Sequence, residues 1–343
     1  MTNHSLNEEY YPAAKIVSMN TMECIRKRPG MYIGSTCQKG IEHLVKELVA
    51  NTVDLFLRNK ARRVKIKVTK NQIIVGDDGP GLPFLVKAPQ SKYSLAHQYL
   101  TEYHNSATSD GHAPHIHLQY TGAGMVVVNA LSERLVVESF QNNQKWTQIY
   151  KRGVIENSCV EKKKGKGTTF TFTPDRTIFP ISDIHRESLR SSLFQCAHLF
   201  PGLEINYNRE KFLSKNGLTD FICLYDFYAD HTMQYTPPFS FYRETKDFLI
   251  QVAAIGQRKR KGLWLSWVNG TSTCEHGSHV NALKKALRNC KWKPTVAAIH
   301  IILKQPQFAG PVKAKLSNRE IVSPIVQLLE EPLRKYLHKI SKI

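Results

Sequence analysis

The chain has 343 residues, and its 48 Lys and Arg residues outnumber its 28 Asp and Glu residues to give a formal net charge of +20. A chain of this length exceeds what a single hydrophobic core usually organises, so we expect two domains. Such an excess of basic residues favours a polyanionic partner, with nucleic acid first and an anionic membrane surface second. The sequence has no apolar run of about 18 residues and no signal-peptide pattern, which argues against a membrane-spanning or secreted protein.

The seven cysteines are odd in number and scattered, and none forms a CxxC pair. This usage is typical of the reducing cytoplasm and argues against a disulfide scaffold or a zinc ribbon. We therefore expect a cytoplasmic protein, and its positive charge predicts association with the nucleoid.

Residues 1–35 show little periodicity and are predicted to form an N-terminal arm that contains Tyr11. A helix is predicted next, because apolar residues recur with the spacing of one helix face over residues 41–53. Glu47 and Asn51 lie one turn apart on this helix and therefore share a face. A carboxylate there can hold a water as a base, and a carboxamide oxygen can bind a hard cation such as Mg²⁺.

The first half then mixes helices and strands without the βαβ regularity of a Rossmann domain, so we expect an α/β sandwich with a mixed sheet. The long segment 91–120 is polar and irregular and is predicted to be a functional loop with short helical pieces. Strands are predicted at residues 63–68, 72–75, 135–140, 146–150, 168–173 and 203–207, and helices at 122–131 and 188–199.

A second α/β domain is predicted from residue 218, where the pattern of elements starts again. Its strands are expected at residues 248–255, 263–268 and 296–302, and its helices at 280–288 and from about residue 318. The chain is therefore divided into an arm (1–35), a first domain (36–217) and a second domain (218–343).

Two glycine-containing turns complete a candidate site. Asp77 ends a predicted strand, so its carboxylate can accept a hydrogen bond from an exocyclic amine such as N6 of adenine. Gly79 and Gly81 let the backbone pass close to a flat base. Gly122 and Gly124 expose backbone N–H groups where a helix begins, which suits a phosphate. Together with the Glu–Asn helix, these turns predict an adenine nucleotide held between a helix and a sheet.

Six motifs, taken together, resemble those of one protein family. They are RKRPGMYIG at 26–34, the Glu-x-x-x-Asn helix, DDGxG at 77–81, GxG followed by NAL at 122–131, the segment 267–279 and the loop 311–316. In these motifs the chain resembles the B subunits of type IIA DNA topoisomerases, which are found in DNA gyrase and topoisomerase IV. The resemblance extends from Lys15 to beyond Leu316. It implies an α/β (α+β) fold, a GHKL ATPase sandwich of the Bergerat type, followed by an α/β transducer domain of ribosomal-S5-like fold.

The resemblance also implies a role for each site residue. Glu47 is expected to be the general base for the attacking water, and His43, one turn earlier, to orient it. Lys313 is expected to reach the γ-phosphate from the transducer and so to couple nucleotide state to domain angle. Asn51 is the expected Mg²⁺ ligand, and Asp77 with Thr168 is expected to read the adenine. The full set expected to bind the nucleotide is Asn51, Asp77, Gly79, Gly81, Gly122, Gly124 and Thr168.

By the same resemblance, ATP and Mg²⁺ are the expected cofactors, and the chain is expected to be an ATPase. Its expected role is an ATP-hydrolysing clamp that couples ATP-driven dimerisation to the capture and passage of duplex DNA. The expected partners are duplex DNA, a second copy of the chain reached by the arm with Tyr11, and the cognate A subunit and TOPRIM region of a topoisomerase. No membrane partner is expected.

The sequence departs from the family pattern in three places. The phosphate lid of the family reads GGLHGVG, whereas residues 118–124 read LQYTGAG here. Pro80 stands where the family has Arg beside the base-binding turn, and Pro311 replaces the Gln of the QTKTKL loop. Because the other site residues are present, we expect ATP binding and slow hydrolysis with altered closure of the lid.

The sequence contains no EGDSA or DxD motif of a TOPRIM domain, so we expect no DNA cleavage or religation from this chain alone. Two interpretations stay open at this point, an N-terminal fragment of a B subunit and a short paralogue that keeps only the ATP gate. Gyrase and topoisomerase IV activity are likewise both open. The alternative function is a degenerate, non-hydrolysing paralogue that binds DNA or a protein partner.

Basic residues gather mostly in the second half, which favours a DNA-facing surface there. A metal site is a weaker hypothesis, based on the histidines of HAPHIH at 112–117 and on Cys274, His276 and His279. We expect these histidines to belong to loop surfaces. The basic clusters are Lys162–Lys164 with Lys166, Arg258–Lys261, the group from Lys284 to Lys293, and the C-terminal tail.

Overall fold

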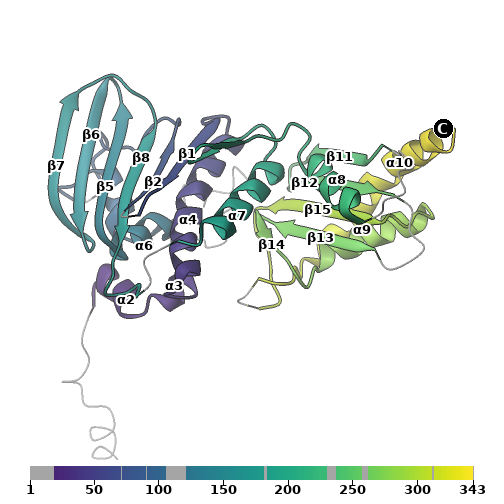
Figure 1. Ribbon diagram of the computed structural model, residues 1–343, viewed down its shortest axis with the longest axis horizontal. Coiled ribbons are helices and arrows are strands. Elements are labelled where there is room, and N and C mark those ends of the chain that lie inside the picture. Colours follow the sequence, from purple (N-terminus) through teal and green to yellow (C-terminus); the bar gives the residue numbers. More distant parts are fainter. Residues whose placement is uncertain are drawn as a thin grey trace, which may run out of the picture.

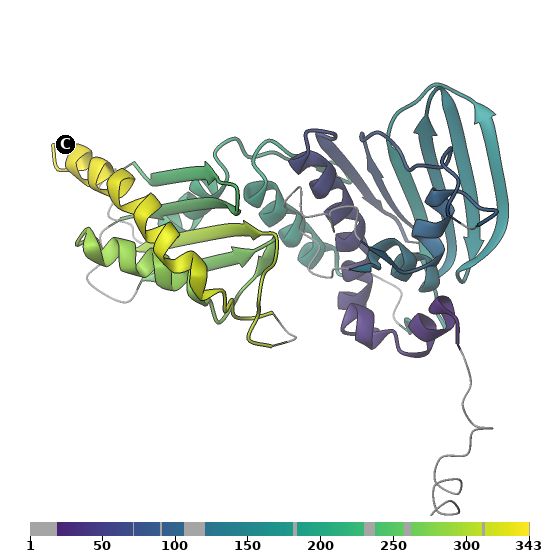
Figure 2. The same cartoon turned by 180° about the vertical axis from the view of Figure 1, so that it is seen from behind.

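The computed structural model describes residues 19–70, 72–89, 91–105, 121–180, 184–229, 237–256, 262–310 and 313–342. Within these ranges the chain folds into two α/β bodies, one around an eight-stranded sheet and one around a five-stranded sheet. Figure 1 shows the two bodies side by side along the long axis of the molecule, and Figure 2 shows the same arrangement from behind.

The eight-stranded sheet is mixed, because β1 runs parallel to β9 while the other neighbouring strands pair antiparallel. The strand order is β10-β9-β1-β2-β8-β5-β6-β7. The strands β3 (His104–Asn105) and β4 (Thr121–Gly122) pair separately. The eight strands are β1 (Arg63–Val68), β2 (Ile73–Asp77), β5 (Ser132–Gln141), β6 (Gln144–Lys151), β7 (Val154–Lys162), β8 (Thr168–Pro174), β9 (Glu204–Tyr207) and β10 (Glu210–Phe212).

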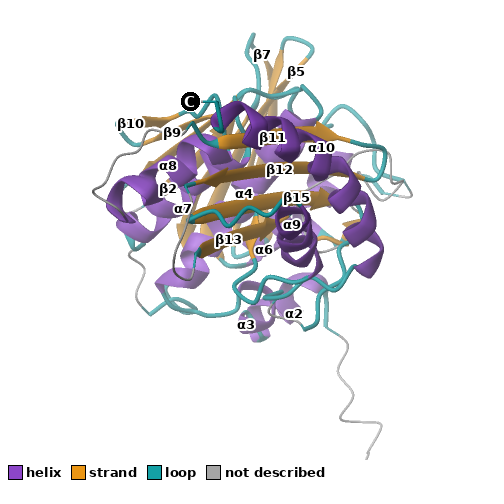
Figure 3. Cartoon of the chain, turned by 90° about the vertical axis from the view of Figure 1, so that its right-hand side faces the viewer, coloured by secondary structure: helices purple, strands orange, loops and turns teal. Residues whose placement is uncertain are grey.

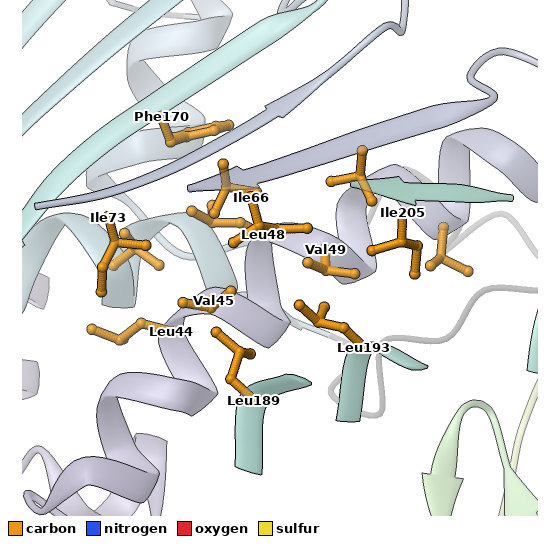
Figure 4. Packing of buried hydrophobic residues seen from close by; sticks show 14 of the residues in the cluster. Leu44, Val45, Leu48, Val49, Ile66, Ile73, Phe170, Leu189, Leu193 and Ile205 are labelled. Atoms are coloured by element: carbon orange, nitrogen blue, oxygen red, sulfur yellow. The ribbon is translucent and has the colours of Figure 1, made fainter. Parts of the chain in front are cut away.

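Helices cover one face of this sheet (Figure 1). The long helix α4 forms because its apolar residues recur at helical spacing, and it buries them against β1, β2, β8, β9 and α7 (Figure 4). Each large apolar side chain buried in this way contributes about 1.5–3 kcal/mol. The helices of this body are α2 (Thr21–Lys27), α3 (Gly30–Ile33), α4 (Gln38–Leu57), α5 (Leu95–Thr101), α6 (Gly124–Ala130) and α7 (Arg186–Leu199).

The described part of the N-terminal segment is packed onto the first body. Asn20 and Glu23 form a capping box that starts α2, with Oδ1 of Asn20 accepting from the Glu23 N–H at 3.0 Å. Ile25 is fully buried in the core. The structure therefore integrates residues 19–35 into the fold, whereas the sequence pattern predicts an arm over all of 1–35. Tyr11 lies outside the described residues.

A buried ion pair fixes the orientation of α2. Arg26 donates from Nη2 to Oδ2 of Asp175 at 2.6 Å and from Nη1 to the carbonyl oxygen of Ala130, also at 2.6 Å. The Asp175 side chain has no exposed surface and also receives Arg152 at 3.1 Å. Burial opposes the charge of Asp175, yet the hydrogen bonds from Arg26 and Thr177 hold the pKa of its carboxyl below the usual value. The RKRPGMYIG motif thus has a structural role at its first residue.

The strand β7 is absent from the sequence-based prediction. Nearly all of its residues, from Val154 to Lys162, are exposed, so no alternation of apolar and polar residues marks it. It forms the edge of the sheet and is held by its antiparallel pairing with β6. The first basic run begins at its end, at Lys162, where charge protects an exposed edge from pairing with other chains.

The five-stranded sheet has the order β11-β12-β15-β13-β14, as Figure 3 shows for the four longer strands. Only β13 and β15 pair in parallel among these described strands. The elements of this body are α8 (Leu218–Ala229), β11 (Phe239–Glu244), β12 (Phe248–Ile255), β13 (Leu263–Val268), β14 (Thr271–Ser272), α9 (Ser278–Asn289), β15 (Val296–Leu303), a short 3₁₀ turn (Arg319–Ile321) and α10 (Val322–Ile340).

Both faces of this second sheet are covered. Every residue of β12 and β15 is buried, which explains why these strands read as continuous apolar runs. One face packs against α9 and α10, and the other packs against α8 and is continuous with the core of the first body. Figures 1 and 2 show α8 and the α9–α10 pair on opposite sides of the sheet.

A row of aromatic side chains joins the two bodies. Phe194 of α7 lies 6.4 Å from Phe221 of α8, and Phe221 lies 5.6 Å, edge to face, from Trp267 of β13 (centroid distances). A second contact of this kind places Phe200 5.3 Å from His300. Aromatic pairs in such geometries add about 0.5–1.5 kcal/mol each beyond their buried area. The two bodies therefore share one continuous apolar core.

No helix in the described part of the chain is long and apolar enough to cross a membrane.

Candidate functional site

The helix α4 presents His43, Glu47 and Asn51 at successive turns of one face. The Nε2 atom of His43 lies 3.2 Å from Oε1 of Glu47, which holds the carboxylate in a fixed direction. The Glu47 side chain is 26% exposed, so it stays in reach of solvent and of a ligand. A partly exposed carboxylate oriented by an imidazole has the geometry of a base that acts on a water molecule.

Asn51 carries an amide nitrogen that is buried and has no hydrogen-bond partner in the described part of the chain. Such an unpaired polar atom is costly unless a ligand satisfies it. A half-turn of the amide exchanges its nitrogen and oxygen, so the same position can offer an oxygen to a hard cation. The residue therefore fits the magnesium-binding position expected from the sequence.

Asp77 lies at the end of β2, in the turn that the DDGPG sequence forms. Its carboxylate accepts a hydrogen bond from the Gly79 N–H at 2.7 Å and another from the backbone N–H of Thr168. Burial raises the pKa of Asp77 to about 6, although these two hydrogen bonds favour the charged carboxylate and act to lower the pKa. The neighbouring Asp78 is committed to the fold instead, since its Oδ1 accepts from the backbone N–H groups of Arg62 and Arg63. The structure thus distinguishes the two aspartates.

The Asp77 turn lies against α4. A side chain at Gly79 would come within 2.7 Å of the Leu55 side chain, one helical turn beyond Asn51. At Gly81 the backbone has a φ of +85°, and a Cβ atom there would lie 2.1 Å from the carbonyl oxygen of Phe140. Gly81 therefore requires glycine, both for the close backbone and for the left-handed conformation, whereas a side chain at Gly79 would have to displace the neighbouring side chains.

Thr168 begins β8 beside this turn and is only 5% exposed. Its Oγ1 lies 2.9 Å from the hydroxyl of Ser139, which in turn accepts from the Leu82 N–H at 2.7 Å. Sequence reasoning missed Ser139, because a serine in a strand carries no motif signal. It also missed Gly167, where a Cβ atom would lie 1.9 Å from the Asp77 carbonyl oxygen and φ is +86°. The Gly-Lys-Gly-Thr-Thr spacing is the signal that points to it.

The glycine loop meets the same face of α4. Gly122 pairs through β4 with His104, and Gly124 is the first residue of α6. A Cβ atom on Gly124 would lie 2.5 Å from Oε2 of Glu47, so the start of α6 packs directly on the expected base. Residues 118–120 of the lid lie outside the described residues.

Lys313 brings the second body to this site. Burial lowers the pKa of its amine, and the negative charge of Glu47 acts in the opposite direction, which locates the two groups close together. The residue has a φ of 59°, and its N–H donates to the carbonyl oxygen of Gly310 at 3.1 Å. The residue lies in the loop after β15, so the second body contributes a cation near Glu47. Pro311 lies outside the described residues.

The structure thus groups the expected residues at two ends of one surface on α4. Glu47, His43, Gly124 and Lys313 form one end, and Asp77 with its turn forms the other. Asn51 lies between them on the helix. A ligand that spans this surface meets a hydrogen-bond acceptor at the sheet end and N–H groups with a cation at the other, which matches a base joined to phosphates.

The weaker metal hypothesis gains no support. The described residues contain no group of three or more His, Cys, Asp or Glu side chains that could hold a metal ion. His276 instead contacts the Ser266 hydroxyl at 2.9 Å, and His279 is buried beside Thr273. Residues 112–117 lie outside the described part of the chain.

A family model matches this part of the chain. Residues 36–178 match the family described as histidine kinase-, DNA gyrase B- and HSP90-like ATPase. The matched range contains all the expected site residues except Lys313.

Curated relatives match nearly the whole chain at lower than 30% identity. The B subunit of DNA gyrase from Clostridium acetobutylicum is 27% identical over 99% of this chain and 58% of its own length. The corresponding gyrase protein of Streptomyces coelicolor is 28% identical over 98% of this chain and 56% of its own length. The chain therefore spans about half the length of the curated relatives that it matches.

Solved structures resemble the fold of both bodies. The 43K ATPase domain of Thermus thermophilus gyrase B has a TM-score of 0.80 with 26% identity, covering 94% of this chain and 92% of that one. The ATPase region of Saccharomyces cerevisiae topoisomerase II has a TM-score of 0.68 with 18% identity, covering 97% and 100%, and shows the fold alone. These likenesses confirm the predicted fold, a GHKL sandwich followed by a transducer domain. The chain is thus similar over nearly its whole length to DNA gyrase B subunits, and its residues 36–178 match the model of the histidine kinase-, DNA gyrase B- and HSP90-like ATPase family.

Proposed function

We propose that the chain binds ATP along the α4 surface and hydrolyses it. The observation that carries this proposal is the convergence of three separate elements on Glu47. His43 approaches it from the same helix, Gly124 from the start of α6, and Lys313 from the second body. A solvated glutamate on a helix surface has no need of these three neighbours.

At the sheet end, Asp77 accepts a hydrogen bond from the exocyclic amine of adenine, and Thr168 provides a hydroxyl beside it. Gly79 and Gly81 keep the turn free of side chains where the base lies. At the other end, the backbone N–H groups of the glycine loop hold the phosphates.

In the hydrolytic step, Glu47 accepts a proton from a water molecule as the water oxygen bonds to the γ-phosphorus and the bond to the β-phosphate bridging oxygen breaks. His43 keeps the carboxylate directed at the water. The ammonium of Lys313 stabilises the charge on the γ-phosphate oxygens, so catalysis is mainly positional and electrostatic. Asn51 would hold Mg²⁺, which would neutralise phosphate charge when bound.

Replacement of Glu47 tests the assignment of the base. Glu47→Ala should abolish ATP turnover and leave ATP affinity within about threefold, because the carboxylate contacts the water and not the adenine. Turnover is measured by phosphate release and affinity by calorimetry with a non-hydrolysable analogue. Glu187→Ala is the matched control, since Glu187 is an exposed carboxylate on α7. Unchanged hydrolysis in Glu47→Ala would show that the base is another group.

We further propose that the chain is a clamp for duplex DNA. The net charge of +20 and the gyrase relatives support DNA as the polyanionic partner, and Lys313 supplies a link between nucleotide state and domain angle. The proposed assembly is a homodimer that forms when ATP binds and works with the A subunit and TOPRIM region of a topoisomerase at the nucleoid. The proposed domain limits stay at 36–217 and 218–343, with the N-terminal segment as the dimer arm.

A second candidate function is a non-hydrolysing module that binds DNA or a partner. The sequence Leu118–Gly124, which departs from the family lid, favours it. Sedimentation of the chain with ATP and with a non-hydrolysable analogue separates the two functions. Nucleotide-dependent dimerisation supports the clamp, whereas no change with either nucleotide supports the module.

A further inference from the structure

A cleft lined by several charged side chains opens at the other end of the strands that form the candidate nucleotide site. It has a volume of about 1040 Å³ and is lined by the β1–β2 turn, the ends of β6 and β8, the start of β5 and the start of α7. Asp77 and Thr168 lie at the C-terminal end of β2 and the N-terminal end of β8, whereas the cleft lies at the opposite ends of both strands. The two sites therefore share strands but not residues.

The cleft is strongly basic. Five cationic side chains line it, against the two carboxylates of Glu133 and Glu156. None of the five forms an ion pair with an acidic side chain of the described residues. The five are Lys70, Arg134, Lys151, Arg176 and Arg186.

Some basic residues on or beside the same sheet are paired. Lys145 contacts Glu138, Arg63 lies 2.6 Å from Glu204, and Arg190 of α7 lies 2.7 Å from Glu210 of β10. The five cations of the cleft differ from these three in having no acidic partner among the described residues.

Strand register places two like charges on directly opposed residues. Arg134 of β5 is the cross-strand partner of Lys151 of β6, so the two side chains project from the same face. Like charges directly opposite each other on neighbouring strands destabilise a sheet. An anion bound between the two side chains would convert this repulsion into attraction.

The spread of the cations sets the size of that anion. Lys70 lies in the turn between β1 and β2, Arg176 follows β8, Arg134 and Lys151 lie on β5 and β6, and Arg186 begins α7. The strands β2, β8, β5 and β6 are consecutive in the sheet, so three spacings of about 4.8 Å give a track of roughly 14 Å. Along a duplex, one strand carries a phosphate every ~3.4 Å of axis, so a track of this length passes about four phosphates. A single phosphate or a triphosphate would leave part of the track unpaired.

We propose that this cleft binds the sugar–phosphate backbone of duplex DNA. It gives the first body a DNA contact of its own, separate from the basic helices of the second body. The inference rests on the proposed DNA role only for the choice of duplex DNA as the polyanion. It does not depend on ATP hydrolysis.

The test compares two double variants that remove the same charge. Arg134→Gln/Lys151→Gln removes two cations from the cleft, and Lys211→Gln/Arg190→Gln removes two paired cations at the opposite edge of the sheet. Affinity for a short fluorescent duplex is measured across a range of salt concentrations on the full chain. The cleft variant should bind about tenfold more weakly at physiological salt, and its log–log salt slope should fall by about 2, whereas the control should change little.

Stability and ATP affinity are measured on the same proteins. The cleft variant should unfold at the same or a slightly higher temperature, because it loses the Arg134–Lys151 repulsion, and should bind ATP normally. Equal duplex affinity and slope in the two double variants would overturn the inference, as would a loss confined to binding of inorganic tripolyphosphate. If the unmodified chain binds no duplex, both the cleft inference and the DNA part of the proposed function are overturned, while the ATPase proposal stands.

Discussion

At the scale of single residues, adjacent aspartates differ through their surroundings. Asp78 accepts two backbone N–H groups and holds β1 in place, whereas burial raises the pKa of Asp77 to about 6. Since the folded-state pKa of Asp77 lies above the ordinary value of 3.8, its neutral form favours folding at low pH, and that contribution is lost as pH rises through about 6. Burial therefore disfavours the charged carboxylate of Asp77, and a hydrogen-bond donor from a ligand would stabilise that charged form.

ATP affinity should depend on the ionisation of Asp77. In the proposed binding mode the adenine amine donates to the carboxylate, so affinity should be full above pH about 6 and fall as the carboxyl gains its proton below that value. We expect a loss of about tenfold between pH 7.5 and pH 5, the equivalent of one charge-assisted hydrogen bond. The measurement is calorimetric titration with a non-hydrolysable analogue at several pH values.

The nucleotide phosphates also titrate in this range, so Asp77→Asn serves as the control. It should bind weakly at all pH values and retain only the pH dependence of the phosphates. A profile of the same steepness in Asp77→Asn and the unmodified chain would remove Asp77 from adenine recognition.

At the scale of elements, α2 depends on one buried ion pair. Asp175 is fully buried and is held by Arg26 and Arg152, with Thr177 completing its hydrogen bonds. Arg26 also ties the end of α6 through the carbonyl of Ala130. The pair thus joins the N-terminal helix to the helix that carries the glycine loop.

Loss of Arg26 should destabilise the protein. Arg26→Ala leaves a buried carboxylate with only one remaining cation, so we expect a loss of about 2–3 kcal/mol in the free energy of unfolding. Urea denaturation gives the value, and Arg28→Ala is the control because Arg28 is exposed at the end of the same helix. Equal stability of the two variants would assign no structural role to the pair.

The depressed pKa of Asp175 also predicts that the difference in unfolding free energy between Arg26→Ala and the unmodified chain shrinks at low pH, as the carboxyl gains its proton.

Elements with a regular apolar pattern were predictable from the sequence. The stripe on α4 and the continuous apolar runs of β12 and β15 correspond to the predicted helix and strands. The strand β7 was not predictable, because an exposed edge strand is held by backbone pairing and not by an apolar face. The helix α8 was missed because it packs between the two bodies, so its apolar residues do not form a single stripe.

The candidate site divides in a similar way. Glycines and carboxylates in fixed order, such as Asp77 with Gly79 and Gly81, carry a signal in the sequence itself. Ser139 and the ion pair of Arg26 with Asp175 carry none, because their partners lie far away in the chain and only the folded sheet brings them together. Recognising Lys313 required a family resemblance, since no local pattern links residue 313 to residue 47.

At the scale of the whole molecule, the two bodies are joined by shared packing as well as by Lys313. Phe221 lies at the centre of the seam, in contact with Phe194 on one side and Trp267 on the other. The far face of the second sheet belongs to a separate cluster around α9 and α10. The contacts of Phe194, Phe221 and Trp267, here called the seam, are therefore expected to decide whether the two bodies unfold together or separately.

Phe221→Ala should weaken the joint unfolding of the two bodies. The unmodified chain should unfold in one calorimetric transition, and the variant should lose about 3–5 kcal/mol and separate into two transitions. Leu224→Ala on the same helix is the control, because Leu224 is 43% exposed. A single transition in Phe221→Ala, displaced no further than in the Leu224 control, would contradict a structural role for the seam.

The opposite placement of the two sites on strand β2 has an electrostatic consequence. Along β2, Ile73 at the basic cleft and Asp77 at the other end are four residues apart, about 14 Å. The Debye length at physiological ionic strength is about 8 Å, so two polyanions held at these ends are largely screened from each other. If both proposals hold, one chain can therefore carry a nucleotide triphosphate and a DNA backbone at the same time with little mutual repulsion.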